Sequence, residues 1–158
     1  MNMKYKNMDK KIVVCGIGNR FRGDDGVGPA LIDMLKKEIK KDNVLLLSCE
    51  SAPENFAGKI EKFCPEKIII IDTVDFGKKP GTIGIVDVNK IKNQNLSTHK
   101  LSLDIFIKYL SEKIDFELIF IGVQPKNTEF SEEISKECKD SLKELKMRVL
   151  KEIINVKL

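Results

Sequence analysis

The sequence predicts an α/β fold of three layers, in which helices cover a twisted, mainly parallel sheet of five strands. Short apolar runs alternate with amphipathic stretches through most of the 158 residues, as in sheets covered on both faces. Residues 67–72 contain four consecutive isoleucines, which is typical of a strand buried on both faces. The connection that follows is too short for a helical crossover, so we expect one antiparallel, hairpin-like strand.

Each element follows from its local pattern: strands are apolar runs, and helices carry apolar residues at helical spacing. Pro29 suits the first turn of the first helix. The pair Pro80-Gly81 marks the turn before the fourth strand, which we expect at an edge of the sheet. Ser131 is expected to open the last helix as a capping box. The predicted strands cover residues 11–16, 43–47, 67–72, 81–88 and 117–123, and the predicted helices cover residues 29–40, 53–63, 101–112 and 131–154.

Length and composition indicate one globular domain, formed by residues 11–158 after a polar tail or lead-in at residues 1–10. The net charge of +4 is spread along the chain, so no nucleic-acid partner is expected. We find no signal peptide and no apolar stretch that could span a bilayer, and we expect a cytoplasmic protein without membrane contact. Small size and charged helices make a monomer the default expectation.

The four cysteines are isolated in the sequence, and no CxxC pair suggests a zinc knuckle or a thioredoxin-type site. Cys15 and Cys49 end apolar runs and are expected to be buried and free. This cysteine usage agrees with a reduced compartment.

A glycine-rich loop, GIGNRFRGDDGVG at residues 16–28, joins the first strand to the first helix. Its first glycines suggest a dinucleotide-binding loop, but Phe21 stands where that fingerprint requires a third glycine. Asp24 and Asp25 would also repel a pyrophosphate at the start of the helix. Nucleotide binding is therefore a poor explanation of the loop.

Polar residues follow several of the predicted strands, and ligands of parallel sheets bind beyond the carboxyl ends of the strands. Asp25 from the loop, Asp72 at the end of the third strand, and His99 before a helix could form a mixed oxygen and nitrogen ligand set. Such a set suits nickel or zinc and leaves positions open for water or substrate. Each residue also has an ordinary explanation, as a helix N-cap, a strand end and an exposed loop histidine, respectively.

Five segments occur in a fixed order along the chain: GIGNRFRGDDGVGP, SAPEN, IIIIDTVDFGKKPG, STHKLSL and IFIGVQP. With this set the chain resembles the hydrogenase maturation endopeptidases, the proteases that trim the large subunit of nickel-iron hydrogenases. The similarity covers most of residues 11–150. The SAPEN and GVQP segments look most like the branch that processes the hydrogenase-3 type of large subunit.

The resemblance implies a twisted five-stranded sheet between helices and three metal-binding residues, which match Asp25, Asp72 and His99. It also implies that the partner is a hydrogenase large-subunit precursor already loaded with nickel. The protease would sense this nickel, bind it transiently and remove a C-terminal extension. Asn19 and Asp24 match the same loop and are expected to be structural: Asn19 because it tolerates a positive φ, and Asp24 because it caps or shapes the turn.

The chemistry has two alternatives, with Asp25 and Asp72 as the candidate catalytic residues in both. The metal could orient the substrate, polarise the scissile carbonyl or lower the pKa of a bound water. Alternatively, the two carboxylates could act together on a water, as in aspartic proteases. The same ligands would also suit a non-catalytic nickel chaperone or checkpoint module that only holds the precursor. An open site of three ligands is expected to bind free divalent ions weakly.

Overall fold

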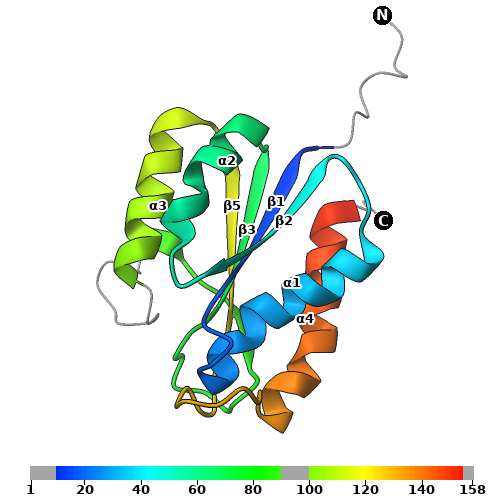
Figure 1. Ribbon diagram of the computed structural model, residues 1–158, viewed down its shortest axis with the longest axis vertical. Coiled ribbons are helices and arrows are strands. Elements are labelled where there is room, and N and C mark those ends of the chain that lie inside the picture. The colour runs from blue at the N-terminus through cyan, green and yellow to red at the C-terminus, as the bar shows by residue number, and fades with distance from the viewer. Residues whose placement is uncertain (1–9, 90–99, 155–158) are drawn as a thin grey trace, which may run out of the picture.

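The computed structural model describes residues 10–89 and 100–154, and over these ranges it shows a five-stranded sheet between two layers of helices (Figure 1). The strand order is β2-β1-β3-β5-β4; β4 pairs antiparallel with β5, and the other pairs are parallel. The predicted fold class, parallel sheet and antiparallel edge strand are therefore confirmed. The elements are β1 (Ile12–Ile17), η2 (Gly23–Gly26), α1 (Val27–Glu38), β2 (Val44–Glu50), η3 (Pro53–Phe56), α2 (Ala57–Phe63), β3 (Lys67–Thr73), β4 (Ile83–Ile85), α3 (Lys100–Lys113), β5 (Glu117–Val123) and α4 (Lys136–Ile154).

The alternation of side chains along the central strands divides the core into two halves. In β3, Ile68 and Ile70 pack with residues of α2 and α3, whereas Ile69 and Ile71 pack with residues of α1 and α4. All four isoleucines are fully buried. Figure 1 shows the two helix pairs on opposite sides of the sheet. The continuous apolar run of β3 is thus explained by helices on both faces.

The four parallel strands end at the same edge of the sheet, which is the lower edge in Figure 1. The loop after β1 and the start of α1 lie at this carboxyl edge. Helix α3 ends at Lys113, shortly before β5 begins at the opposite edge, so its first residue, Lys100, also lies toward the carboxyl edge. None of the helices in the described ranges is both long and apolar enough to cross a membrane.

The fourth strand is shorter than predicted, because only Ile83–Ile85 pair with β5. Gly81 has a φ of 86°, which is incompatible with an extended strand. After Val86 donates to the carbonyl of Phe120, the chain leaves the sheet. The edge position of this strand is as predicted.

The last helix begins at Lys136, so the expected capping box at Ser131 is wrong. Ser131 instead pairs with the glycine-rich loop: its N–H donates to the carbonyl of Phe21 at 2.9 Å, and its carbonyl accepts from Gly23 at 2.7 Å. The cap is Ser135, whose Oγ accepts from the N–H of Cys138 at 3.3 Å. The type of cap was predictable, but the choice between two serines depended on a contact that is distant in sequence.

Cys64 is the C-cap residue that follows helix α2, and it adopts a left-handed conformation with a φ of 54°. This conformation costs a non-glycine residue about 1–2 kcal/mol, and glycine avoids most of that cost despite its greater chain entropy. Since the side chain of Cys64 is exposed, Cys64→Gly should raise the free energy of unfolding by about 0.5–1 kcal/mol. Urea denaturation measures the change. Cys64→Ser is the matched control, and a glycine variant no more stable than the serine variant would contradict this explanation.

Candidate active site

The glycine-rich loop is folded tightly against the protein's own backbone. Gly18 has a φ of 140°, and a Cβ added there would overlap the carbonyl of Asp25. A Cβ on Gly16 would likewise overlap the carbonyl of Gly28, where β1 and α1 cross closely. The space beside these glycines is filled by the chain itself. Their role is therefore to place the aspartates of the loop at the carboxyl edge of the sheet.

Asp25 lies in the short helix η2 and is almost completely buried, with 3% of its surface exposed. Its Oδ2 accepts from the backbone N–H of Asn19 at 2.8 Å, and its Oδ1 accepts from the hydroxyl of Thr73 at 3.1 Å. The residue before α1 is Gly26, and no side chain caps that helix. The alternative interpretation of Asp25 as the N-cap of α1 is therefore wrong.

Asp72 is fully buried near the end of β3, and its Oδ1 accepts from the backbone N–H of Thr73 at 2.8 Å. Thr73 thus donates to both acids, through its backbone to Asp72 and through its hydroxyl to Asp25. Residues from two separate segments, the loop after β1 and the end of β3, meet at this point. Asp25 and Asp72 are therefore linked through one residue, Thr73, and their joint action in a site stays a prediction.

His99, the third predicted residue, lies outside the described residues. The chain is described again from Lys100, where α3 begins. Within the ranges that the structure describes, no group of three or more His, Cys, Asp or Glu side chains is arranged to hold a metal ion. The participation of His99 and the binding of nickel by the three residues remain predictions.

Asp24 has the structural role that the sequence suggested. It is fully buried, and it accepts from the N–H groups of Lys126 at 2.7 Å, Asn127 at 3.1 Å and Ser135 at 2.7 Å, and from the Ser135 hydroxyl at 3.0 Å. Burial acts to raise the pKa of Asp24, but these hydrogen bonds outweigh it and hold the pKa below its ordinary value. Asp24 therefore joins the loop after β1 to the segment before α4.

Asn19 is structural in a different way from the one predicted. Glycines of this loop, and not Asn19, carry its positive φ values. The side-chain oxygen of Asn19 accepts from the N–H of Phe21 at 2.9 Å, and its own N–H donates to Asp25. This short turn directs a backbone donor toward Asp25.

Gln124 and Thr73 are two further polar residues whose roles the sequence analysis did not assign. Gln124 is 7% exposed, and its Oε1 accepts from the N–H groups of Phe76 at 2.6 Å and Lys78 at 3.3 Å. Its Nε2 donates to Asp75 at 3.1 Å. Gln124 thus holds the segment that follows Asp72. Its position directly after a strand was the available signal, as was the position of Thr73 beside Asp72.

The cysteines of the described chain are free, and Cys15 and Cys49 are buried as predicted. A hydrogen bond with Cys49, together with burial, raises the pKa of Cys15 well above its ordinary value. Burial raises the pKa of Cys138 to about 11. The exposed thiol, Cys64, lies at the start of β3, at the opposite edge from the two acids. A thiolate nucleophile at the site is not supported.

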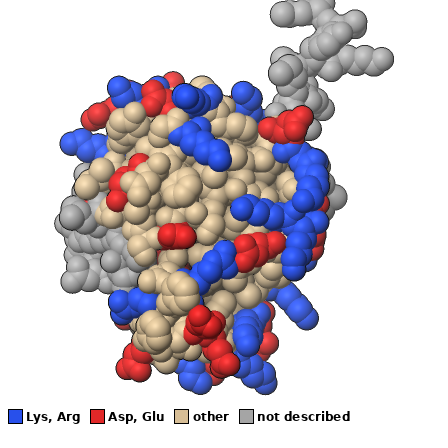
Figure 2. Space-filling model, viewed as in Figure 1, with Lys and Arg blue, Asp and Glu red and all other residues tan. Residues whose placement is uncertain are grey.

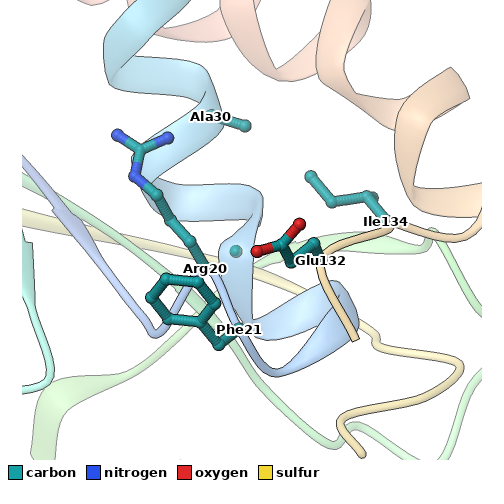
Figure 3. Close-up of a pocket in the computed structure, with 6 residues that line it drawn as sticks. Arg20, Phe21, Ala30, Glu132 and Ile134 are labelled. Atoms are coloured by element: carbon teal, nitrogen blue, oxygen red, sulfur yellow. The ribbon is translucent and has the colours of Figure 1, made fainter. Parts of the chain in front are cut away.

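Two of the hollows beside the loop that carries Asp25 are bordered by Phe21. The first has a volume of about 270 Å³, and in Figure 3 Phe21 and Ile134 stand on opposite sides of it. The second has a volume of about 570 Å³ and extends from residues 19–21 to residues 48–52, at the end of β2. Phe21 borders both hollows and is 53% exposed. A bound polypeptide could therefore contact the surface on either side of Phe21.

Comparison with known proteins shows the family to which this chain is similar. A profile of the HycI type, described as hydrogenase maturation protease, matches residues 29–152 and begins just after the loop that carries Asp25. A putative hydrogenase maturation protease of Methanocaldococcus jannaschii is 37% identical over 141 residues, covering 83% of each chain. The hydrogenase 3 maturation protease of Escherichia coli K12 is 33% identical over 139 residues, covering 87% of each chain.

Solved structures agree with this placement. The [NiFe] hydrogenase maturation protease HycI of Thermococcus kodakarensis superimposes with a TM-score of 0.83 at 35% identity, covering 97% of each chain. The endopeptidase HybD of E. coli, at 22% identity and a TM-score of 0.81, shares the fold. The fold is thus that of the solved α/β maturation endopeptidases. The chain belongs to the hydrogenase maturation protease family, whose members process the hydrogenase large subunit, and the expected family is confirmed.

Replacement of Asp24 by asparagine should destabilise the fold, because an amide nitrogen cannot accept from the backbone N–H groups that face it. Hydrogen bonds to a buried charge contribute about 1.5–3 kcal/mol, so Asp24→Asn should lower the free energy of unfolding by about 2–3 kcal/mol at neutral pH. Since the folded pKa of Asp24 is lowered, its stabilisation is complete above the unfolded pKa of about 4 and is lost as the pH falls through the folded value.

Urea denaturation at several pH values tests this prediction. The difference between the two proteins should be constant near neutral pH and should narrow below about pH 4. Asp33→Asn is the control, because Asp33 forms an exposed ion pair with Arg20 at 2.6 Å that contributes at most about 1 kcal/mol. Equal losses of stability in the two variants would contradict the assigned role of Asp24.

Proposed function

We propose that this protein removes the C-terminal extension of a nickel-loaded hydrogenase large-subunit precursor, with Asp25 and Asp72 at the reacting centre. The proposal depends mainly on one observation: two buried carboxylates from separate segments are hydrogen-bonded to the same residue, Thr73, at the carboxyl edge of the sheet. Ligands of parallel sheets bind at this edge. Carboxylates that are buried this deeply require compensation by hydrogen bonds or a cation.

In this proposal the nickel arrives as part of the substrate and is bound transiently by Asp25, Asp72 and His99. Carboxylate oxygens can accept a hydrogen bond and still coordinate a cation, because each has two lone pairs. Binding would place the peptide near the nickel next to the two acids. A water could then attack the scissile carbonyl, activated either by the metal or by the carboxylate pair. The absence of a suitably placed thiol in the described chain favours a water nucleophile.

The protein is proposed to act as a cytoplasmic monomer without nucleic-acid or membrane partners. Three of its free cysteines are buried and reduced, which agrees with a reducing compartment. Figure 2 shows one face of the molecule, on which basic and acidic side chains are mixed among uncharged ones. A nucleic-acid-binding face would show a continuous basic patch instead.

The test is to incubate the purified chain with nickel-loaded precursor and with precursor that lacks nickel. The C-terminal fragment should appear by gel and mass spectrometry only with the loaded precursor. Asp25→Asn, Asp72→Asn and His99→Ala should each lower the cleavage rate by at least about 100-fold, since each removes a group from the reacting centre. Glu144→Gln, which changes an exposed carboxylate of α4 that pairs with Arg148, should cut at the normal rate.

Two other results are informative. Tight binding of the loaded precursor without any fragment would favour the alternative, a nickel chaperone or checkpoint module. Equal cutting of loaded and nickel-free precursor would contradict nickel sensing. A nickel titration of the isolated chain by calorimetry adds a further check, because submicromolar affinity would contradict a ligand set that the substrate completes.

A further inference from the structure

We propose that the hydroxyl of Thr73 is a positioning group, which holds the carboxylate of Asp25 in the orientation that the cleavage reaction needs. This inference rests on the proposed function, because it assumes that Asp25 acts at the reacting centre. It assigns a role to a residue that is itself neither an acid nor a candidate metal ligand.

The geometry of Asp25 supports this role. Donors from two different elements hold its two oxygens: the backbone N–H of Asn19 at 2.8 Å and the hydroxyl of Thr73 at 3.1 Å. Two donors on different oxygens restrict rotation of the carboxylate plane. The Asn19 donor belongs to the same loop as Asp25, whereas Thr73 belongs to β3. The Thr73 hydroxyl is therefore a contact that ties the orientation of Asp25 to the strand that carries Asp72.

The position of Thr73 in the sheet explains why it can contact both acids. Side chains alternate along β3, so Thr73 is on the face of Ile69 and Ile71, which is covered by α1 and α4, and Asp72 is on the other face. Asp25 comes directly before α1. Thr73 is 3% exposed, so water is largely excluded from its hydrogen bond to Asp25.

Hydrogen-bond donors behind metal-binding or catalytic side chains commonly contribute 10- to 100-fold to metal affinity or activity. The two contacts of Thr73 can be separated experimentally, because Asp72 is bound by the backbone and Asp25 by the side chain. Thr73→Val keeps the shape and the backbone N–H but removes the hydroxyl. Thr73→Ser keeps the hydroxyl and removes only the methyl group.

The experiment measures single-turnover cleavage of nickel-loaded precursor at saturating enzyme, together with the Kd of the precursor. Thr73→Val should cut about 10- to 100-fold more slowly with a Kd within about threefold of the original, and Thr73→Ser should cut within about threefold of the original rate. Crystal structures of both variants provide a readout without substrate. The Asp25 carboxylate should be rotated in the valine variant and unchanged in the serine variant.

Each outcome decides between explanations. Cleavage by Thr73→Val at the original rate would overturn the inference, and so would an unrotated Asp25 carboxylate in its crystal structure. If the serine variant is as slow as the valine variant, the methyl group and not the hydroxyl matters, which also overturns the inference.

If the valine variant does not fold, Thr73→Ala and Thr73→Ser form the replacement pair, since they differ only by the hydroxyl. If the original protein does not cut, the proposed function fails, and the crystal structures still judge the position of Asp25.

Discussion

The carboxyl edge of the sheet depends on hydrogen bonds to three buried carboxylates. Asp24, Asp25 and Asp72 are each at most 3% exposed, and a buried carboxylate without partners would cost several kcal/mol. The fold places N–H and O–H donors around them: four hydrogen bonds to Asp24, and one from each of Asn19 and Thr73 to Asp25. The donors to Asp24, and the Thr73 hydroxyl that binds Asp25, come from segments distant in sequence. The loops of this edge are therefore tied together by the same contacts that bury the acids.

Much of the architecture could be predicted from local pattern, because each strand and helix carries its own periodic signal. The four isoleucines of β3 required cover on both faces, and the structure provides it. The predictions that were wrong concern places where a contact between residues distant in sequence determines the local structure. Ser131 was expected to cap α4 by its local pattern, but it pairs with Phe21, and Ser135 becomes the cap because it also binds Asp24. No local pattern contains that information.

The candidate site was predictable to a different degree for each residue. Asp25 and Asp72 could be proposed because both lie where strands end at one edge, and in the structure both accept a hydrogen bond from Thr73. Thr73 and Gln124 could not be assigned, because threonine or glutamine at the end of a strand has many ordinary roles. Only the folded structure shows that Thr73 contacts Asp25 and that Gln124 binds the segment after Asp72. His99 lies outside the described residues, so its place in the site remains a prediction from sequence.

The adjacent pair Asp24-Asp25 illustrates how one short segment can serve stability and chemistry separately. Both residues lie in η2, and consecutive side chains of a 3₁₀ helix point about 120° apart. When Asp25 is directed toward β3, Asp24 must therefore be directed elsewhere. It binds the segment before α4, where its donors hold the pKa below the ordinary value. The two neighbouring acids therefore face different parts of the protein. Asp24 stabilises the loop that holds Asp25 in place.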